Sequence, residues 1–357
     1  MKHILILSAS TGAGHTRAGE ALKESAKYYA PNITVRHIDM ATILSSPARH
    51  LLIDSYNTLA GRYPNAWGWF YRRTQNEMHL NHAAFWPKLI HRIDGSPLRH
   101  LVRQLQPDGI VTTHFFAGIL FKTAIPTATI ITDYAVHPFW LMGNSNLYFV
   151  STDEMRRDMI VNGIAKERVH ITGIPINPVF YVNKPIEKPE RKTILFLSGG
   201  YGLIRIDRCV RALCTQSQPL IVISIAGRNK KLKTLLSGIK VPTHIEHQVI
   251  GWTDTIEDSM RAADIIIGKP GGLTITESVA LKKPFIAINP IPGHEDANVR
   301  YLEKNGYGTL AKNMNHLVSL VQKPPAVIAP GYKNTPTTSK NTPAAKMIWE
   351  TLQNGLV

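Results

Sequence analysis

Cysteine, acidic residues and long apolar runs are all scarce in this sequence of 357 residues. Its two cysteines, Cys209 and Cys214, lie on one expected helix at a spacing that turns them to different faces, so we expect no disulfide between them. No cluster of Cys and His has the spacing of a metal site. This composition fits a reducing cytoplasm. The first apolar run ends quickly in a glycine-containing loop, which favours a buried strand over a signal peptide. No run approaches the roughly 18 apolar residues of a transmembrane helix.

Acidic residues are outnumbered by basic ones, with 25 Asp and Glu against 41 Lys and Arg, and the net charge is +16. Such an excess favours an anionic partner, which by charge alone is nucleic acid, an anionic membrane surface or a phosphorylated ligand. The sequence lacks the RNP aromatics and recognition helices of nucleic-acid-binding modules. We therefore expect no nucleic-acid partner.

Apolar, β-rich runs alternate with helical patterns along the chain. Buried strands separated by helices are typical of parallel sheets covered on both faces. The expected strands are residues 3–7, 34–38, 108–112, 127–131, 147–150, 169–172, 193–197, 220–225, 243–249, 265–267 and 285–288. Helical patterns include residues 16–29, 153–162, 207–213, 230–236 and 274–280. The fold class is therefore α/β.

A proline-rich, charged stretch at residues 177–191 separates two halves, and the second half restarts with a strand, a glycine-rich turn and a helix. This weak repetition predicts two Rossmann-like domains, residues 1–180 and 190–330, facing each other across a cleft. Residues 324–343 are rich in Pro, Thr and Asn, which predicts an irregular segment. We expect residues 344–357 to form a helix that packs back on the first domain.

The first turn of interest, residues 10–15, follows the first strand and opens a helix. Gly12 and Gly14 allow a ligand to approach the backbone N–H groups at the helix N-terminus. A dinucleotide fingerprint needs a third glycine where Arg17 stands, so a NAD site is not favoured. His15 faces the ligand crevice of such a sheet, where a neutral imidazole can act as a base. The alternative is a solvent-facing residue at a helix start.

A second candidate segment, TDYAVHPFW at residues 132–140, leaves the carboxyl end of the fourth strand. Asp133 and His137 are candidates for the ligand crevice there. A carboxylate can act as the base itself or orient a histidine. The alternative for Asp133 is a loop residue that caps a turn.

The strongest motif is GKPGGLTITE at residues 268–277, after a buried strand. It is not a P-loop, because Lys269 precedes the glycines. We expect a helix from about residue 273, with the N–H groups of Gly271, Gly272 and Leu273 and the hydroxyl of Thr274 facing a diphosphate. Glu277, one turn later, suits two ribose hydroxyls. Pro270 fixes the entry into the turn.

Two further turns extend this donor-binding region. Gly199, Gly200 and Gly202 form a backbone-rich turn suited to anionic oxygens. The turn at residues 290–298 offers carboxylates and an amide to sugar hydroxyls, and its candidate residues are Gly293, His294, Glu295, Asp296 and Asn298. A metal on Glu295 and Asp296 lacks support from any other oxygen cluster.

Residues 49–103 combine aromatic and basic side chains. Tryptophan and tyrosine at the headgroup level, with cations for anionic lipids, are what an interfacial membrane contact needs. The candidate residues are Trp67, Trp69, Phe70, Arg72 and Arg73. The alternative is an aromatic helical hairpin that covers a core.

Taken together, the motifs ILILSASTGAGH, TDYAVHPFW, VHITGIPI, AGRNKKLK, IIGKPGGLTITESVALKKP and NPIPGHEDANVRYLEKNG make the chain resemble one family over about residues 3–320. It resembles the monogalactosyldiacylglycerol synthases and the bacterial processive diacylglycerol β-glucosyltransferases. More distantly it is similar to the GlcNAc transferase that completes the lipid-linked peptidoglycan precursor. The resemblance implies a GT-B fold, with UDP-hexose on the second domain, residues 249–252 (including Gly251) against uracil, and inversion without an essential metal. Relatives often have Gln where this chain has His294, which leaves the hexose open.

The resulting expectation is an inverting hexosyltransferase that moves glucose or galactose from UDP-glucose or UDP-galactose to diacylglycerol, with no cofactor. His15 is the first candidate for the base and Asp133 the second, either as the base itself or as the group that orients His15 or His137. We expect peripheral attachment to the cytoplasmic face of an anionic membrane. The alternatives are a polyprenyl-linked acceptor, a UDP-GlcNAc 2-epimerase-like enzyme, and a membrane-bound UDP-sugar sensor. Processivity and oligomeric state stay open.

Overall fold

A computed structural model describes residues 2–55, 58–59, 63–77, 95–120, 123–185, 189–200, 202, 204–325 and 343–355. The chain divides into two compact units. The first comprises Met1–Pro178, Ile291–His294 and Pro336–Val357, and the second Val179–Pro290 and Glu295–Thr335. The short segment Ile291–His294 therefore belongs to the first unit, although the sequence places it within the second half.

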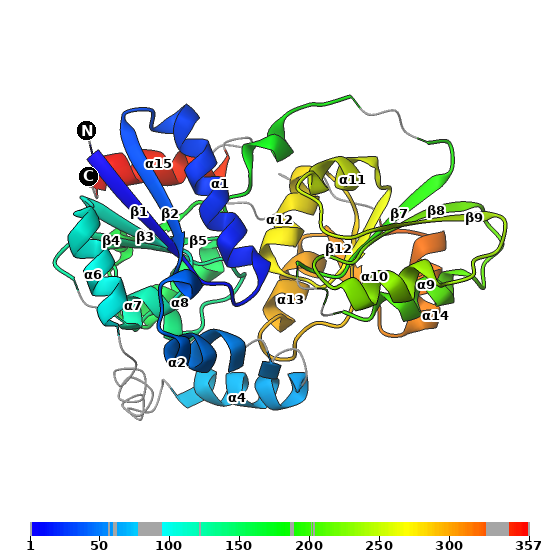
Figure 1. Cartoon of the computed structure of the whole chain (residues 1–357), viewed down its shortest axis with the longest axis horizontal. Helices are drawn as coiled ribbons and strands as arrows, with labels where there is room; N and C mark the ends of the chain where they lie inside the picture. The colour runs from blue at the N-terminus through cyan, green and yellow to red at the C-terminus, as the bar shows by residue number, and fades with distance from the viewer. Residues whose placement is uncertain are drawn as a thin grey trace. The chain divides into compact units, whose positions relative to one another are not determined.

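The first unit holds a six-stranded parallel sheet among its described residues, in the order β2-β1-β3-β4-β5-β6 (Figure 1). The strands are β1 (Lys2–Ser8), β2 (Ile33–Asp39), β3 (Gly109–Thr112), β4 (Thr127–Ile130), β5 (Leu147–Val150) and β6 (Val169–Ile171). The helices are α1 (Ala13–Tyr29), α2 (Ser46–Arg49), α4 (Pro64–Glu77), α6 (Ser96–Leu105), α7 (Phe116–Leu120), α8 (Asp153–Val161) and α15 (Ala344–Gly355). Shorter helical turns are η1 (Met40–Thr42), η2 (His50–Asp54), η3 (Pro138–Trp140) and η4 (Lys166–Arg168).

Alternate residues of β1 supply the two faces of this sheet, as the two-residue period of a strand requires. Leu5 and Leu7 pack with side chains of α6 and α7, while Ile4 and Ile6 pack with side chains of α1 and α15. Both faces are therefore covered by helices, which explains why β1 reads as a continuous apolar run.

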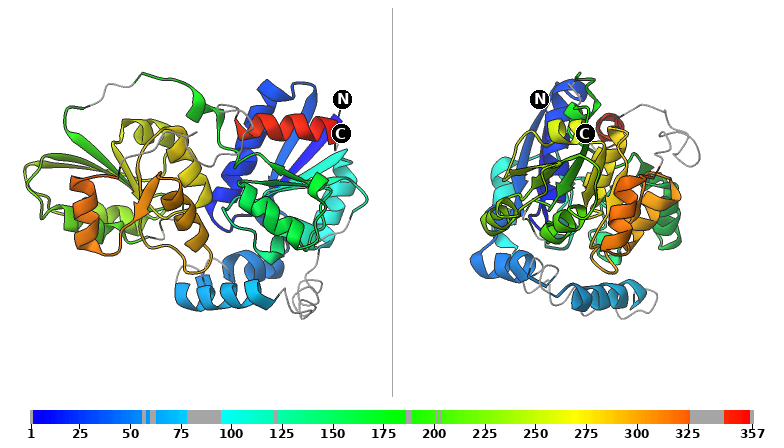
Figure 2. Two further views of the ribbon diagram at one scale, coloured as in Figure 1. Left: turned by 180° about the vertical axis from the view of Figure 1, so that it is seen from behind. Right: turned by 90° about the vertical axis from the view of Figure 1, so that its right-hand side faces the viewer.

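The C-terminal helix α15 lies against α1 in the first unit (Figures 1 and 2). Trp349 is fully buried, and its Nε1–H donates to the carbonyl of Leu22 at 3.1 Å and to Ser25 Oγ at 3.0 Å. Burying an indole of this size while pairing its N–H makes Trp349 the anchor of the helix.

The second unit holds another six-stranded parallel sheet among its described residues, in the order β12-β11-β10-β7-β8-β9. The strands are β7 (Lys192–Leu197), β8 (Leu220–Ile225), β9 (Ile245–Ile250), β10 (Ile265–Gly268), β11 (Phe285–Ala287) and β12 (Gly308–Leu310). The helices are α9 (Ile206–Leu213), α10 (Lys230–Ser237), α11 (Ile256–Ala262), α12 (Gly272–Ala280), α13 (Asp296–Lys304) and α14 (Met314–Gln322), preceded by the turn η5 (Pro178–Tyr181).

Strand order fixes where a ligand can bind in each sheet. In the second unit the chain moves from β7 outward to β9, then returns to β10 on the other side of β7 and moves outward again. The loops after β7 and β10 therefore diverge and leave a crevice at the carboxyl ends of the strands. The same reversal occurs between β1 and β3 in the first unit. Two Rossmann-like halves with parallel sheets confirm the predicted fold class.

The expected strands are all present, and their ends differ from the predicted ones by two residues or fewer. Strand β12 was not predicted, because an edge strand of three residues carries too little apolar pattern. Cys209 and Cys214 are both free, and Cys209 is buried. Among the described residues, no helix is both long and apolar enough to cross a membrane. Outside the described residues lie Phe85 and Trp86 of the aromatic and basic stretch 49–103, Tyr201 of the glycine turn after β7, and residues 326–342 of the stretch 324–343 that was predicted to be irregular.

Candidate functional site

His15 lies at the switch point of the first sheet, in the first turn of α1. Gly12 precedes the helix with φ 115°, a conformation that favours glycine, and a Cβ there would meet nothing within 4 Å. Asp39 supports this loop, because its carboxylate accepts from the backbone N–H of Ser10 at 3.2 Å and binds the Ser10 hydroxyl. Gly14 follows within the first helical turn.

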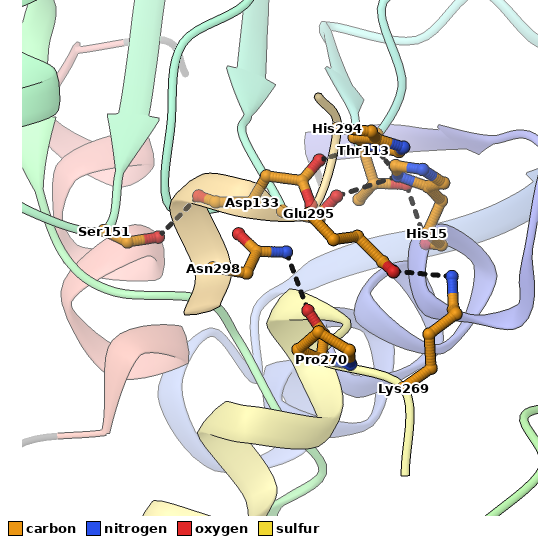
Figure 3. A network of polar contacts seen from close by, with 10 residues as sticks. His15, Thr113, Asp133, Ser151, Lys269, Pro270, His294, Glu295 and Asn298 are labelled. Carbon is orange, nitrogen blue, oxygen red and sulfur yellow. Dashed lines mark hydrogen bonds and ion pairs between the residues drawn. The ribbon is translucent and has the colours of Figure 1, made fainter. Parts of the chain in front are cut away.

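The His15 ring is held by the loops that follow β3 and β4 (Figure 3). Its Nδ1 lies 2.9 Å from the carbonyl oxygen of Thr113 and 2.8 Å from Thr132 Oγ1. A carbonyl oxygen only accepts, so Nδ1 carries the proton and donates. In the neutral ring the lone pair then lies on Nε2, and Nε2 is the atom that can accept a proton.

His114 and His137 have the opposite tautomer and a structural role. In each ring Nδ1 accepts from the backbone N–H two residues later, Phe116 at 3.2 Å and Phe139 at 3.3 Å, so Nε2 carries the proton. His137 Nε2 then donates to Thr74 Oγ1 and to the Tyr71 carbonyl.

Burial lowers the pKa of His137 to about 3 and lowers that of His114 well below its ordinary value. Both rings are therefore neutral and tied to the backbone. This geometry argues against His137 as a general base. Its side chain instead caps η3 and links η3 to α4.

Asp133 pairs with His294 in the first unit (Figure 3). Asp133 Oδ2 lies 3.4 Å from His294 Nε2, and both side chains are mostly buried. A carboxylate accepts, so Nε2–H of His294 donates and its Nδ1 holds the lone pair. Tyr71 stacks on the His294 ring with a centroid distance of 5.2 Å. The sequence suggested Asp133 as a partner of His15 or His137, and in the structure it contacts His294.

The segment that carries His294 packs tightly on α4. A Cβ on Gly68 would lie 2.6 Å from the carbonyl oxygen of Pro292. Gly293 has φ 78° and approaches the Gly68 carbonyl, Tyr71 and Arg72. The position of His294 thus depends on two glycines that let two backbones meet.

In the second unit, the predicted phosphate turn lies between β10 and α12, at the switch point of the sheet. Gly271 is the residue before the helix, and no side chain caps α12 there. The Gly271 N–H donates to the Lys269 carbonyl at 2.8 Å, so it does not face a ligand as predicted. The first-turn N–H groups of Gly272, Leu273 and Thr274 have no intrahelical partner and give this end of α12 its partial positive charge.

Two side chains at the start of α13 bind this turn (Figure 3). Lys269 Nζ lies 2.6 Å from Glu295 Oε1, and the Glu295 side chain is only 3% exposed. Asn298 is fully buried, and its Nδ2 donates to the Pro270 carbonyl at 3.0 Å. Asn298 therefore positions the turn, whereas the sequence had suggested a sugar contact. Asp296 is half-buried in the first turn of α13.

Glu277 is placed one turn into α12 as predicted, and it is 2% exposed. Thr276 next to it donates back to the Gly272 carbonyl at 2.8 Å, so its hydroxyl serves the helix. Thr274 is half-buried and remains the hydroxyl closest to the helix start.

The glycine turn after β7 packs against the turn after β8. Gly202 has φ 61°, and a Cβ there would lie 2.4 Å from Asn229 Cβ. Asn229 Nδ2 donates to the Gly202 carbonyl at 2.9 Å. Gly199 also has a positive φ, but a Cβ there would meet nothing within 4 Å. Gly200 accepts the Arg228 N–H at 3.0 Å.

Arg228 and Trp252 form an exposed pair beside Gly251, after β9. The guanidinium carbon of Arg228 lies 4.2 Å from the Trp252 ring centroid, a cation–π contact. Trp252 is 45% exposed and donates from Nε1 to Asp254 at 2.8 Å. A flat surface made of an aromatic ring and a guanidinium group is suited to stacking with a nucleobase.

The predicted membrane residues divide between two faces of α4. Trp69 is 61% exposed, and Arg72 and Arg73 are exposed, with the Arg73 guanidinium 5.5 Å from the Trp69 ring centroid. Trp67 and Phe70 are half-buried on the side of Tyr71. The helix therefore covers the core with one face and exposes a tryptophan with two arginines on the other.

Sequence reasoning missed several residues that complete these arrangements. Thr113, His114 and Tyr71 were not singled out, because their roles depend on contacts with residues more than 60 positions away. The pairing of Lys269 with Glu295 was also missed. No group of three or more His, Cys, Asp or Glu among the described residues is placed to hold a metal ion.

Two family models match the chain, one for each half. Residues 15–176 match monogalactosyldiacylglycerol (MGDG) synthase, and residues 194–352 match the glycosyltransferase family 28 C-terminal domain. Among curated relatives, the processive diacylglycerol beta-glucosyltransferase of Bacillus subtilis is 26% identical over 90% of this chain and 86% of its own. The enzyme of the same name from Staphylococcus aureus is 29% identical over 90% and 84%.

Solved structures show the same fold at lower identity. The crystal structure of Acinetobacter baumannii MurG aligns with a TM-score of 0.57 and 16% identity, over 90% of each chain. A UDP-GlcNAc 2-epimerase from Neisseria meningitidis bound to UDP-GlcNAc aligns with a TM-score of 0.61 and 14% identity, over 99% of this chain and all of its own. Both support the GT-B assignment.

Proposed function

We propose that the chain is a glycosyltransferase that transfers a hexose from a UDP-sugar to diacylglycerol with inversion, because residues 15–176 match the monogalactosyldiacylglycerol synthase model and residues 194–352 match the glycosyltransferase family 28 C-terminal domain. The named relatives are diacylglycerol glucosyltransferases, which supports glucose as the hexose and diacylglycerol as the acceptor.

The observation that carries the proposal is the tautomer of His15. Its Nδ1–H is fixed by a backbone carbonyl, so Nε2 is the basic atom, and the ring stands at the switch point of the first sheet. A general base needs a ring held in one orientation and a nitrogen that carries the lone pair.

In the proposed reaction the sn-3 hydroxyl oxygen of diacylglycerol bonds to the anomeric carbon while the bond from that carbon to the UDP oxygen breaks. The hydroxyl proton passes to His15 Nε2, and the electron pair of the broken bond leaves with UDP. Positive potential at the N-terminus of α12 and the charge of Lys269 stabilise the leaving diphosphate. We expect the base to contribute roughly 10²–10⁴-fold, and positioning most of the rest.

The Arg228–Trp252 pair is our candidate for the uracil, and Glu277 for the ribose. Thr132 and Thr113 act on His15 rather than on substrate. We expect no essential metal, so the rate of transfer should be the same with and without EDTA.

The acceptor side of the proposal involves a membrane surface. The exposed Trp69 with Arg72 and Arg73 supplies an aromatic ring for the headgroup level and cations for anionic lipids. We therefore propose peripheral attachment through α4, at the cytoplasmic face.

The test is direct. Purified protein is incubated with UDP-glucose and UDP-galactose separately, with diacylglycerol in mixed micelles, and lipid products are identified by mass spectrometry. Conversion of diacylglycerol to a hexosyl lipid supports the proposal. His15→Gln should lower turnover by at least about a hundredfold while UDP binding is kept, and His100→Gln, at an exposed position on α6, is the matched control.

The fold similarity to UDP-GlcNAc 2-epimerases makes epimerisation the second candidate. An epimerase needs no acceptor, so UDP-GlcNAc converted in the absence of lipid would favour it. A polyprenyl phosphate acceptor is tested in the same micelle assay. Transfer to that lipid without transfer to diacylglycerol would overturn the acceptor assignment.

A further inference from the structure

Lys269 and Glu295 form an ion pair at the turn where we place the donor diphosphate (Figure 3). The Nζ–Oε1 distance is 2.6 Å, with side-chain exposures of 29% for Lys269 and 3% for Glu295. Glu295 precedes α13, but its carboxylate does not cap that helix. A nearly buried carboxylate requires a partner, because the desolvation of an isolated charge is costly.

We propose that Lys269 exchanges partners when the donor binds. Its ammonium group leaves Glu295 for the diphosphate, and the Glu295 carboxylate then accepts hydrogen bonds from hydroxyls of the hexose. This inference rests on the proposed function, since it places the diphosphate at the N-terminus of α12.

The surrounding geometry restricts this exchange to side chains. The Gly271 N–H donates to the Lys269 carbonyl at 2.8 Å, and Asn298 holds the Pro270 carbonyl at 3.0 Å, so the backbone of the turn is fixed on both sides. Lysine carries three donors on a flexible stem and is suited to moving between two anions. The diphosphate, with more charge than one carboxylate, is the stronger partner.

The exchange discriminates between the donor and the product. UDP-hexose offers Lys269 a diphosphate and offers Glu295 hydroxyl donors, so both charges stay paired. UDP offers only the diphosphate, so a carboxylate that is 3% exposed loses its cation without receiving hydroxyl donors from the ligand. Glu295 therefore competes with UDP for Lys269 and favours release of UDP after the sugar has been transferred.

The experiment is calorimetric titration of uridine, UDP, UDP-glucose and UDP-galactose into the protein and its variants. Lys269→Gln should weaken UDP binding roughly ten- to hundredfold and leave uridine binding unchanged. Glu295→Gln should tighten UDP binding roughly three- to tenfold, because the competitor for the ammonium is gone. The same variant should weaken binding of the UDP-hexose that the protein uses.

The double variant isolates the exchange. Once Lys269 is Gln, adding Glu295→Gln should no longer tighten UDP, since the two effects act through one contact. Lys282→Gln, at an exposed lysine just beyond the other end of α12, is the matched control and should bind all four ligands as the unaltered protein does. Thermal unfolding of each variant checks that the second unit is folded.

Two results would overturn the inference while leaving the donor site in place. One is equal UDP affinity in the unaltered protein and Lys269→Gln. The other is a Glu295→Gln variant that binds UDP more weakly, because Glu295 would then only hold Lys269 in position. Absence of UDP and UDP-hexose binding in the unaltered protein would instead remove the proposed function itself.

Discussion

His137 gives the most quantitative prediction, because the residue is 2% exposed and both ring nitrogens are hydrogen-bonded. Burial lowers its pKa in the folded protein to about 3 from the ordinary value of 6.5. The unfolded chain therefore binds more protons than the folded one between these two values. Neutral His137 contributes stability that is complete above pH 6.5 and is lost as the pH falls toward 3.

The size of the loss follows from the ordinary pKa of the unfolded histidine. Between pH 7.5 and pH 5.5 that histidine takes up most of one proton, while the folded ring takes up almost none. His137 alone should then lower the free energy of unfolding by about 1.4 kcal/mol over this range. His114 is buried with its pKa lowered and adds to the loss in the same window.

The perturbation is His137→Asn, whose side-chain oxygen can still accept from the Phe139 N–H but cannot titrate. Denaturant unfolding is followed by tryptophan fluorescence, and Trp67, Trp69, Trp140 and Trp349 all lie in the first unit. The variant should be less stable at pH 7.5 but should lose about 1.4 kcal/mol less than the unaltered protein on going to pH 5.5.

His100→Gln, at an exposed histidine, is the control and should leave the difference between the two pH values unchanged. An equal loss in the unaltered protein and in His137→Asn would refute the reasoning. It would mean that the folded ring takes up a proton as readily as the unfolded one does.

Three further predictions concern the packing around the candidate sites and the exposed face of α4. Gly68→Ala should lower the transfer rate by roughly tenfold or more, because the added Cβ would displace the Pro292 carbonyl and with it His294, a candidate for binding the sugar hydroxyls. Binding to vesicles should persist in this variant. Unchanged steady-state kinetics would contradict the prediction. Changing both Arg72 and Arg73 to Glu should weaken sedimentation with anionic vesicles without changing the affinity for UDP, and salt should release the unaltered protein from these vesicles. Salt-independent binding of the unaltered protein to neutral vesicles would refute the electrostatic contribution to membrane attachment. Gly202→Ala should lower the free energy of unfolding by about 2 kcal/mol or more, and Gly199→Ala by only about 1 kcal/mol, because both glycines have a positive φ but only Gly202 lacks space for a Cβ. Similar melting temperatures for the two variants would count against this explanation.

The sequence by itself determined the two parallel sheets and the positions of the main turns. The burial of a parallel strand can be read from the strand's own residues, because both of its faces are covered and the run is continuously apolar, as residues 4–7 are. Glycines before a helix are likewise read directly, because the backbone conformation at Gly12 or the helix start at Gly272 depends on nearby residues. His15 was found by the same reasoning, as a histidine just after the first strand.

Only the tertiary structure decided which of the polar side chains work together. The sequence offered both His15 and His137 as catalytic candidates, yet the Thr113 carbonyl fixes one tautomer and the Phe139 N–H the other. The partner of Asp133 is 161 positions away, and no sequence period reports a contact of that span. Likewise the ion pair of Lys269 with Glu295 forms because β10 and β11 are neighbours in the sheet, which brings together the turns that follow them. Strand order, rather than strand pattern, thus determines the chemistry at these turns.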